Sequence, residues 1–197
     1  MSAQGTVKAS PRVRLLDTAT ELFTSHGIRA VGIDRILKDS KVAKASLYNA
    51  FGSKDALVVA YLEQMHDSDV AAWETRTAPM QRPRDRILAF FDLVTTLPGA
   101  IPTGSPYIAA ALEFPEPATP GEHAIRAAVD AHREWVLDTI TSELRAMGLQ
   151  DPDNIEEMAM RLVVLHDGAV TAARMHDHTT SVRTARNMAE MILRLVD

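Results

Sequence analysis

One short stretch of the chain carries small and polar side chains that can read DNA bases: Lys44, Ala45, Ser46 and Asn49. Serine and asparagine exchange hydrogen bonds with base edges, a methyl group can contact thymine, and a lysine ammonium can reach a base or a phosphate. Leu47 and Phe51 are four residues apart, so a helix over residues 44–51 would turn both toward one packed side. The pattern therefore predicts a short helix that packs against the protein through one face and exposes the side chains for DNA contact on its other faces.

The residues before this helix predict a second helix and a tight turn. Ile33, Ile36 and Leu37 share one helical face, and the polar residues 39–41 have the length of an inter-helix turn. Gly32 is the expected cap of this helix, where free backbone N–H groups could bind a phosphate. Two short helices joined in this way form a helix-turn-helix, whose second helix enters the major groove of DNA.

The charge distribution of the 197-residue chain favours a DNA contact near its N-terminal end. The net charge of −5 argues against such a contact when it is taken alone. Residues 1–54, however, hold nine Lys and Arg against four Asp and Glu, and they include every lysine of the protein; residues 55–197 hold 12 Arg against 22 acidic residues. A basic unit before an acidic remainder is typical of a DNA-binding head on a body that avoids DNA. Chance segregation of solvated charge is the alternative.

Apolar periodicity predicts helices along the chain and no strand, so the expected fold class is all-α. The expected helices span about 10–26, 32–38, 44–51, 54–74, 84–97, 107–112, 123–147, 151–175 and 181–196. Residues 114–121 contain three prolines and are expected to form a loop. Residues 1–9 are expected to form an arm in which Lys8 reaches DNA, although a solvated tail fits equally well.

Residues 10–60 resemble the N-terminal DNA-binding domain of the TetR/AcrR family of transcriptional regulators. The similarity rests on Leu22-Phe23, on Gly27, and on the ending in which Leu47-Tyr48 precede Phe51, Ser53-Lys54 and Leu57. The family often has Gly where Lys41 stands and Ser where Ala43 stands. The resemblance implies that Tyr48 and Lys54 contact phosphates, and that the protein forms a homodimer through its last two helices. The domains expected are therefore a three-helix DNA-binding domain at residues 1–54 and a helical ligand-binding and dimerisation domain at residues 55–197.

The last two helices carry small and aliphatic residues that permit close helix approach. The expected dimer interface comprises Leu165, Gly168, Ala169, Ala172, Met188, Ala189 and Ile192. Burial of these side chains within their own chain is the alternative.

Seven of the ten aromatic residues fall between Tyr61 and Trp135, which predicts an apolar ligand cavity in the middle of the chain. The candidate lining residues are Met65, His66, Phe90, Phe91, Tyr107, Phe114, His132, Trp135, His166 and Asp167. Ordinary core packing is the alternative for each of them, and a solvated helix face is a further alternative for His66.

The sequence carries no pattern of an enzyme: we find no Gly-rich phosphate loop, no nucleophile elbow and no His-Glu-x-x-His helix. We therefore expect no catalytic residue, no cofactor and no metal; His176-Asp177-His178 lies in a predicted connection that no cysteine can assist. The first ten residues lack the apolar stretch of a signal peptide, and no run approaches the roughly 18 apolar residues of a membrane span. With no cysteine either, we expect a cytoplasmic protein.

The expected function is a homodimeric repressor that binds a double-stranded DNA operator and is released by a small apolar or aromatic effector. The predicted helix at 54–74 would link the effector site to the DNA-binding head. One alternative is a helical small-molecule-binding protein or enzyme with a vestigial DNA-binding head. Another is a regulator controlled by a protein partner or by none. The clustering of all lysines around the motif favours the first function.

Overall fold

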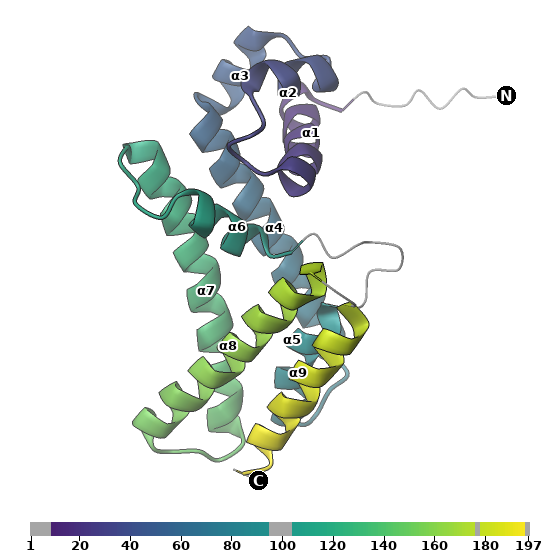
Figure 1. Cartoon of the computed structure of the whole chain (residues 1–197), viewed down its shortest axis with the longest axis vertical. Helices are drawn as coiled ribbons and strands as arrows, with labels where there is room; N and C mark the ends of the chain where they lie inside the picture. Colours follow the sequence, from purple (N-terminus) through teal and green to yellow (C-terminus); the bar gives the residue numbers. More distant parts are fainter. Residues whose placement is uncertain (1–8, 95–103, 176–177, 196–197) are drawn as a thin grey trace, which may run out of the picture. The chain divides into compact units, whose positions relative to one another are not determined.

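The computed structural model describes residues 9–94, 104–175 and 178–195, and within them it contains nine α-helices and no strand (Figure 1). The helices are α1 Pro11–His26, α2 Ile33–Ser40, α3 Lys44–Phe51, α4 Lys54–Thr77, α5 Pro83–Leu93, α6 Pro106–Glu113, α7 Pro120–Ala146, α8 Pro152–Met175 and α9 His178–Leu193. The predicted all-α class is thus confirmed. Residues 95–97 and 196 of the predicted helices, like Lys8 of the predicted arm, lie outside the described residues.

Helix α7 begins three residues earlier than its periodicity predicted. Thr119 caps it: its hydroxyl accepts a hydrogen bond from the backbone N–H of Glu122 at 3.2 Å. Pro120 occupies the first helical position, where a proline is favourable because its missing N–H would have had no partner there. The proline that was expected to belong to a loop therefore starts the helix.

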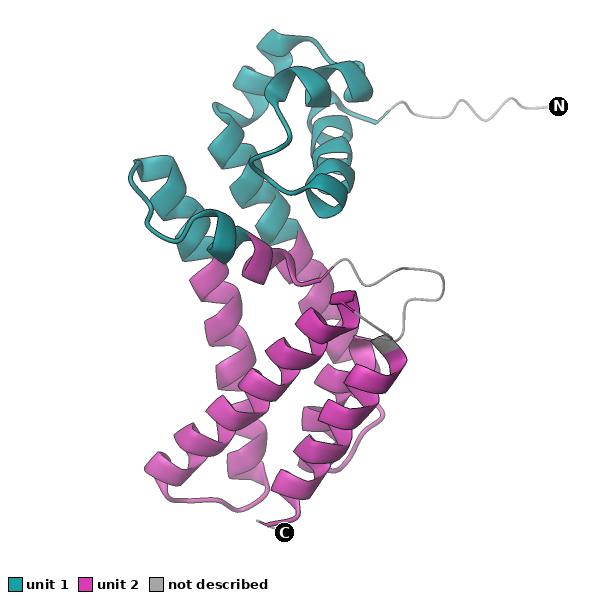
Figure 2. Cartoon of the chain, in the orientation of Figure 1, with its two compact units in different colours: residues 1–64, 110–128 teal, residues 65–109, 129–197 magenta. Residues whose placement is uncertain are grey.

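The chain forms two compact units, which Figure 2 colours separately. The first comprises residues 1–64 and 110–128, and the second comprises residues 65–109 and 129–197. The predicted division between residues 54 and 55 lies within the first unit. Helices α4, α6 and α7 each contribute residues to both units.

In the first unit, α1 packs against α2 and α3. Its buried stripe places Leu15 and Ala19 in the interior, each fully shielded from solvent. Leu47 is the fully buried anchor of α3. Burial of such an aliphatic side chain stabilises a fold by about 1.5–3 kcal/mol, so this anchor fixes which face of α3 is left for solvent.

The turn between α2 and α3 ends α2 with a Schellman motif. Lys41 has φ 54° and ψ 40°, in the left-handed region. The N–H of Val42 donates to the carbonyl of Leu37 at 3.3 Å, and the N–H of Lys41 donates to the carbonyl of Lys38 at 3.4 Å. A glycine would adopt this left-handed position without the steric cost that the Lys41 side chain imposes. Ala43 then precedes α3 with no side-chain cap.

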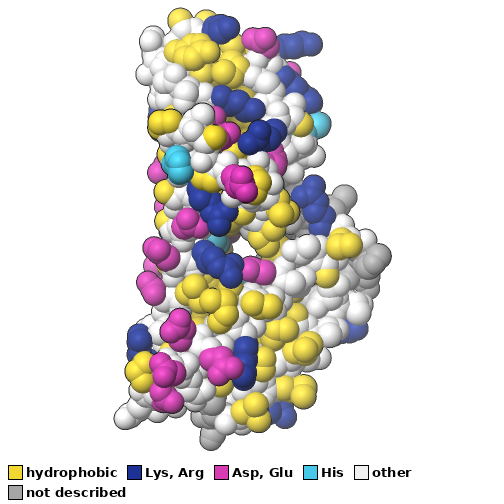
Figure 3. Space-filling view, turned by 60° about the vertical axis from the view of Figure 1, so that its left-hand side comes forward, with side chains coloured by type: hydrophobic (Ala, Val, Ile, Leu, Met, Phe, Trp, Pro, Cys, Tyr) yellow, Lys and Arg dark blue, Asp and Glu magenta, His cyan; other side chains and the backbone are white. Residues whose placement is uncertain are grey.

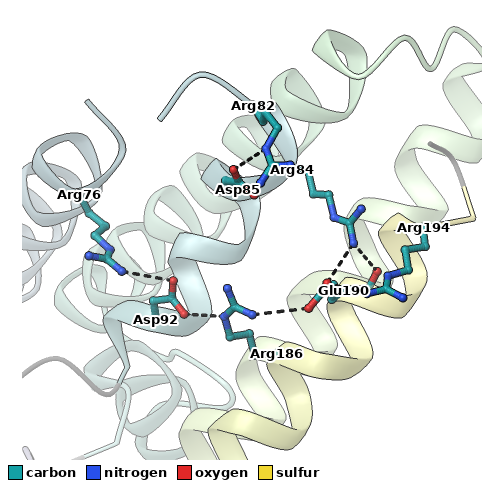
Figure 4. A network of polar contacts seen from close by, with 8 residues as sticks. All are labelled: Arg76, Arg82, Arg84, Asp85, Asp92, Arg186, Glu190 and Arg194. Atoms are coloured by element: carbon teal, nitrogen blue, oxygen red, sulfur yellow. Dashed lines mark hydrogen bonds and ion pairs between the residues drawn. The ribbon is translucent and has the colours of Figure 1, made fainter. Parts of the chain in front are cut away.

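The second unit is built around α5, which is buried on all sides. Residues 87–91 (Ile-Leu-Ala-Phe-Phe) are each at most 5% exposed, and α5 packs against both α8 and α9. Arginine–carboxylate pairs also join α5 to α4 and to α9 (Figure 4). Asp92 on α5 pairs with Arg76 on α4 and with Arg186 on α9, at 3.5 and 2.6 Å. No helix within the described ranges is long and apolar enough to cross a membrane.

Candidate DNA-binding surface and ring cluster

Helix α3 exposes the side chains that the sequence assigned to DNA contact. Lys44, Ala45, Tyr48 and Asn49 are exposed, and Ser46 is half-buried. Tyr48 retains 43% of its surface in solvent, while Leu47 beside it retains none. Among the described residues, neither Tyr48 nor Asn49 has a side-chain hydrogen-bond partner. This face of the helix therefore has donors and acceptors available for another molecule.

Two other predicted DNA contacts lie beside α3 in different environments. Gly32 is exposed, with an extended backbone and no side-chain cap for α2. Lys54 is half-buried instead, and its ammonium Nζ donates to the carbonyl of Ile28 at 2.7 Å. Burial lowers the pKa of Lys54, and the nearby charges of Asp55 and Glu113 oppose that shift. An ammonium has three N–H donors, so this bond leaves others for a phosphate.

The loop between α1 and α2 is held by residues that the sequence analysis missed. The carboxylate of Glu113, at the end of α6, accepts hydrogen bonds from the backbone N–H groups of Ile28 and Arg29 at 2.9 and 2.5 Å. Arg29 in turn donates to the carbonyl of Glu113 and pairs with Glu122 of α7 at 3.3 Å. The Arg29 guanidinium lies 4.5 Å from the ring centre of Phe114. Phe114, a predicted ligand residue, is therefore buried in the first unit beneath an arginine.

The second unit brings most of the predicted ligand residues into one group of rings, here called the ring cluster. Its members are His66 and Trp73 of α4, Phe90 of α5, Tyr107 of α6, His132 and Trp135 of α7 and His166 of α8. Tyr107 and His132 are stacked, with centroids 3.5 Å apart and planes inclined by 6°. Trp135 contacts His66, Trp73 and Phe90 edge-to-face, at 5.5, 6.5 and 5.6 Å. Five helices thus converge on one aromatic site.

Polar contacts join the ring cluster to the carboxylate of Asp69, one turn along α4 from His66. The Tyr107 hydroxyl donates to Asp69 Oδ2 at 3.1 Å, and the Nδ1 atoms of His66 and His132 lie 3.2 Å apart. Burial raises the pKa of Asp69. Burial, together with His66 and His166, lowers the pKa of His132 to about 3. The imidazole of His132 is therefore neutral near pH 7.

The remaining predicted ligand residues lie at the margin of the ring cluster. Phe91 is fully buried in the core and contacts the ring of His166, with centroids 5.8 Å apart. Met65 is half-buried on α4. Asp167 pairs with Arg133 at 2.8 Å. Burial would raise the pKa of Asp167, but hydrogen bonds from His166 and Arg133 outweigh that effect and lower it.

Trp73 and Asp69 were absent from the predicted site although the sequence held a signal for both. They stand seven and three residues after His66, so all three share one face of α4.

Met160, Val164 and Met191 were likewise absent from the predicted dimer interface.

The outer faces of α8 and α9 carry an exposed apolar surface, here called the α8–α9 face. Met160, Val164, Met188 and Met191 are 40, 58, 48 and 67% exposed. A hollow of about 670 Å³ lies on this face, and its apolar lining is Met160, Val164, Leu165, Met188 and Ile192. Figure 3 shows hydrophobic side chains gathered over the lower part of the molecule, with acidic side chains beside them.

Predicted interface residues divide between this face and the interior. Gly168 is exposed, with open space where a Cβ would stand, and Ala172 is half-buried. Ala169 and Ala189 are instead 3 and 0% exposed and belong to the core of their own chain. The structure thus moves these two alanines from the expected interface to the interior, because they lie on the inward sides of α8 and α9.

No group of three or more potential metal ligands occurs in the part of the chain that the structure describes. Two residues of the His176-Asp177-His178 run, at 176 and 177, lie outside that part.

The chain is similar to proteins of a known family. Residues 15–61 match the family model described as "Bacterial regulatory proteins, tetR family". A TetR-family transcriptional regulator from Streptomyces coelicolor has a similar crystal structure, with a TM-score of 0.81, 34% identity, and coverage of 94% of this chain and 95% of that one. An uncharacterized HTH-type transcriptional regulator of Mycobacterium tuberculosis is 28% identical over 163 residues, which are 83% of this chain and 75% of that protein.

The reduced form of Escherichia coli NemR shares the fold alone, with a TM-score of 0.77 at 23% identity and coverage of 93% of this chain and 97% of that one. The exposed reading face of α3, its helix-turn-helix setting and the full-length similarity to the Streptomyces regulator agree with one another. The chain belongs to the TetR family and is a DNA-binding transcriptional regulator.

Proposed function

We propose that the protein is a homodimeric repressor whose operator affinity is lowered when a small molecule binds the ring cluster. One observation carries this proposal. Helices α4, α6 and α7 each hold a cluster contact in the second unit and a contact to the α1–α2 loop in the first. The residues that contact the ring cluster are Asp69 on α4, Tyr107 on α6 and His132 on α7. The residues of the same three helices that contact the α1–α2 loop are Lys54, Glu113 and Glu122.

The DNA-bound state would place one α3 helix of each protomer in successive major grooves, about 34–36 Å apart. Ser46 and Asn49 would bind base edges, and the methyl group of Ala45 would contact a thymine. Lys44, Tyr48, Lys54 and the backbone at Gly32 would contact phosphates and set the register. The exposure of α3 supports these roles.

The homodimer would form through the α8–α9 face. Two α8 and two α9 helices would then make a four-helix interface of the kind that small residues allow. The exposed methionines and Val164 support this assignment, because a soluble monomer rarely leaves so continuous an apolar surface in water. Leu165, Gly168, Ala172, Met188 and Ile192 would lie within or beside the contact.

Release would follow from a shift between two populations. A ligand that binds one arrangement of α4, α6 and α7 more tightly than another must favour that arrangement by its differential affinity, typically about 1–3 kcal/mol. Because the same helices hold Ile28 and Arg29 through Lys54 and Glu113, the shift would change how the helix-turn-helix is supported.

The test begins with selection of bound sequences from a random DNA duplex pool at two salt concentrations. Enrichment of a pseudo-palindrome is the expected result, and it supplies an operator for effector screening. Binding that depends on salt without enrichment of any sequence would contradict the proposal. Aromatic compounds that bind the ring cluster should then lower operator affinity by about 5–150-fold.

A further inference from the structure

We infer that the ring cluster is a site for an organic cation, an amine or quaternary ammonium compound with an aromatic or aliphatic body, and that Asp69 is its counter-ion. This inference rests on the proposed function to the extent that the ring cluster is the effector site. It adds the sign of the effector's charge and names the residue that selects it.

Asp69 is a carboxylate with unused acceptor capacity inside an aromatic site. Its one hydrogen-bond partner among the described residues is the Tyr107 hydroxyl, and no described cation forms an ion pair with it. An ionised carboxylate offers about four lone-pair positions. The burial that raises the pKa of Asp69 is a cost of leaving this charge without a cation. A bound ammonium would remove that cost.

Two other carboxylates among the described residues near the site are already paired with arginines. Arg133 pairs with Asp167 at 2.8 Å, and Arg86 pairs with Glu143 at 2.7 Å. In the part of the chain that the structure describes, the histidines at the site are His66, His132 and His166. His132 is neutral near pH 7 because burial and its two histidine neighbours disfavour its charged form. A cationic ligand would therefore gain an ion pair with the Asp69 carboxylate, which an anionic ligand could not form.

The rings of the site already bind one cation. The Arg86 guanidinium lies 4.9 Å from the ring centre of Trp73, while Phe90 stacks with Trp73 at 5.6 Å. Arg86 and Phe90 both belong to α5, and their contacts with the ring of Trp73 leave it less available to a ligand. Among the described residues, Trp135 makes edge-to-face or tilted ring contacts and no stacked one, and it is half-buried. An indole face of this kind is the strongest aromatic partner for a cation.

Solvent reaches this end of the ring cluster. His66, Asp69, His132 and Trp135 are all half-buried, whereas Phe90 and Trp73 are buried. Asp69 and Trp135 both keep part of their surface in solvent, so a ligand can reach each of them. A cation there would combine a charge-assisted contact to Asp69 with the face of Trp135.

Intrinsic fluorescence is a direct assay, because the chain's two tryptophans, Trp73 and Trp135, are both in the ring cluster. The probes are benzyltrimethylammonium, its neutral carbon isostere neopentylbenzene, and the anion 3-phenylpropanoate. Each is titrated into the full-length protein without DNA. The cation should bind at least about tenfold more tightly than the isostere, and the anion more weakly than either.

The variants separate charge from shape. Asp69→Asn keeps the size of the side chain and an acceptor for Tyr107, and it should abolish the preference for the cation over the isostere. Asp67→Asn removes an exposed carboxylate two residues away on α4 and should leave that preference unchanged. Melting curves of both variants confirm that they fold.

The outcomes distinguish this inference from the proposed function. Equal binding of cation and isostere, tighter binding of the anion, or an undiminished preference in Asp69→Asn would each overturn the inference. Release of the operator by a neutral compound alone would also overturn it while leaving the ligand-responsive function intact. Binding of the cation that depends on Asp69 but never changes operator affinity would support the inference and contradict the ligand-responsive function.

Discussion

Glu113 and Ile28, 85 residues apart in the sequence, meet through a hydrogen bond of 2.9 Å from a backbone N–H to a carboxylate. Ile28 is 2% exposed, so its N–H has little access to water and depends on this partner. The same carboxylate also accepts the N–H of Arg29. One side chain at the end of α6 therefore satisfies two successive N–H groups of the loop that enters the helix-turn-helix.

Replacing Glu113 with Ala should destabilise the protein by about 1–3 kcal/mol, because it leaves the buried N–H of Ile28 without an acceptor. Urea denaturation at neutral pH measures the change. Glu116→Ala is the matched control, since Glu116 is exposed and lies three residues further on. Equal stability of the two variants would show that the N–H of Ile28 finds another partner.

Replacing Asn49 with Ala should relax discrimination at one base position and cost about 1–3 kcal/mol at the preferred operator. The exposed carboxamide of Asn49 has no described partner to lose, so the fold should keep its melting temperature. Selection from a random duplex pool with wild type and variant gives the two binding profiles. A profile that does not change would remove Asn49 from the residues that read the sequence.

The helices could be predicted because their signals are local. Leu47 and Phe51 fixed the packed side of α3, and Gly27 and Gly52 marked helix ends within a residue. The support of the site was not predictable in this way. Glu113 reaches Ile28, and Tyr107 reaches Asp69, across 85 and 38 residues of chain that no periodicity connects.

Small residues on α8 and α9 posed a different difficulty. Gly168 and Ala169 are neighbours of similar size, yet the first is exposed and the second is 3% exposed in the core. The small residues of a helix indicate that it can approach another helix closely, but they do not indicate which side of the helix makes that contact. That choice depends on where α5 packs, and α5 is distant in the sequence.

Replacing Lys41 with Gly should stabilise the protein by about 1 kcal/mol, because a side chain at φ 54° pays a steric cost that glycine avoids. The gain in stability is measured as an increase in the melting temperature of the protein in the absence of DNA. Lys38→Gly, within α2, provides the opposite control, with an expected loss of about 1 kcal/mol. A lower melting temperature for Lys41→Gly would mean that the Lys41 side chain stabilises the turn by more than its backbone costs.

Acidification should destabilise the ring cluster through His132. Its pKa of about 3 in the folded protein lies below the 6.5 of an unfolded histidine, so the unfolded chain takes up the proton more readily. This contribution is fully present above pH 6.5 and is lost as the pH falls toward 3. Melting temperatures between pH 7 and pH 5 should fall more steeply for wild type than for His132→Asn. Parallel slopes would contradict the assignment, since His66, His166 and Asp167 remain in both proteins.

Replacing Gly168 with Leu should dissociate the dimer without unfolding the protomer. A Cβ at this position meets no atom within 4 Å in the protomer, and leucine is a better helix former than glycine by roughly 1 kcal/mol. The protomer should therefore remain folded, while the larger side chain prevents close approach of a second copy at the α8–α9 face. Sedimentation at several concentrations measures the dissociation, and Gly168→Ala, which adds one methyl group, should remain a dimer. A Leu variant that sediments as an intact dimer would place the interface on another surface.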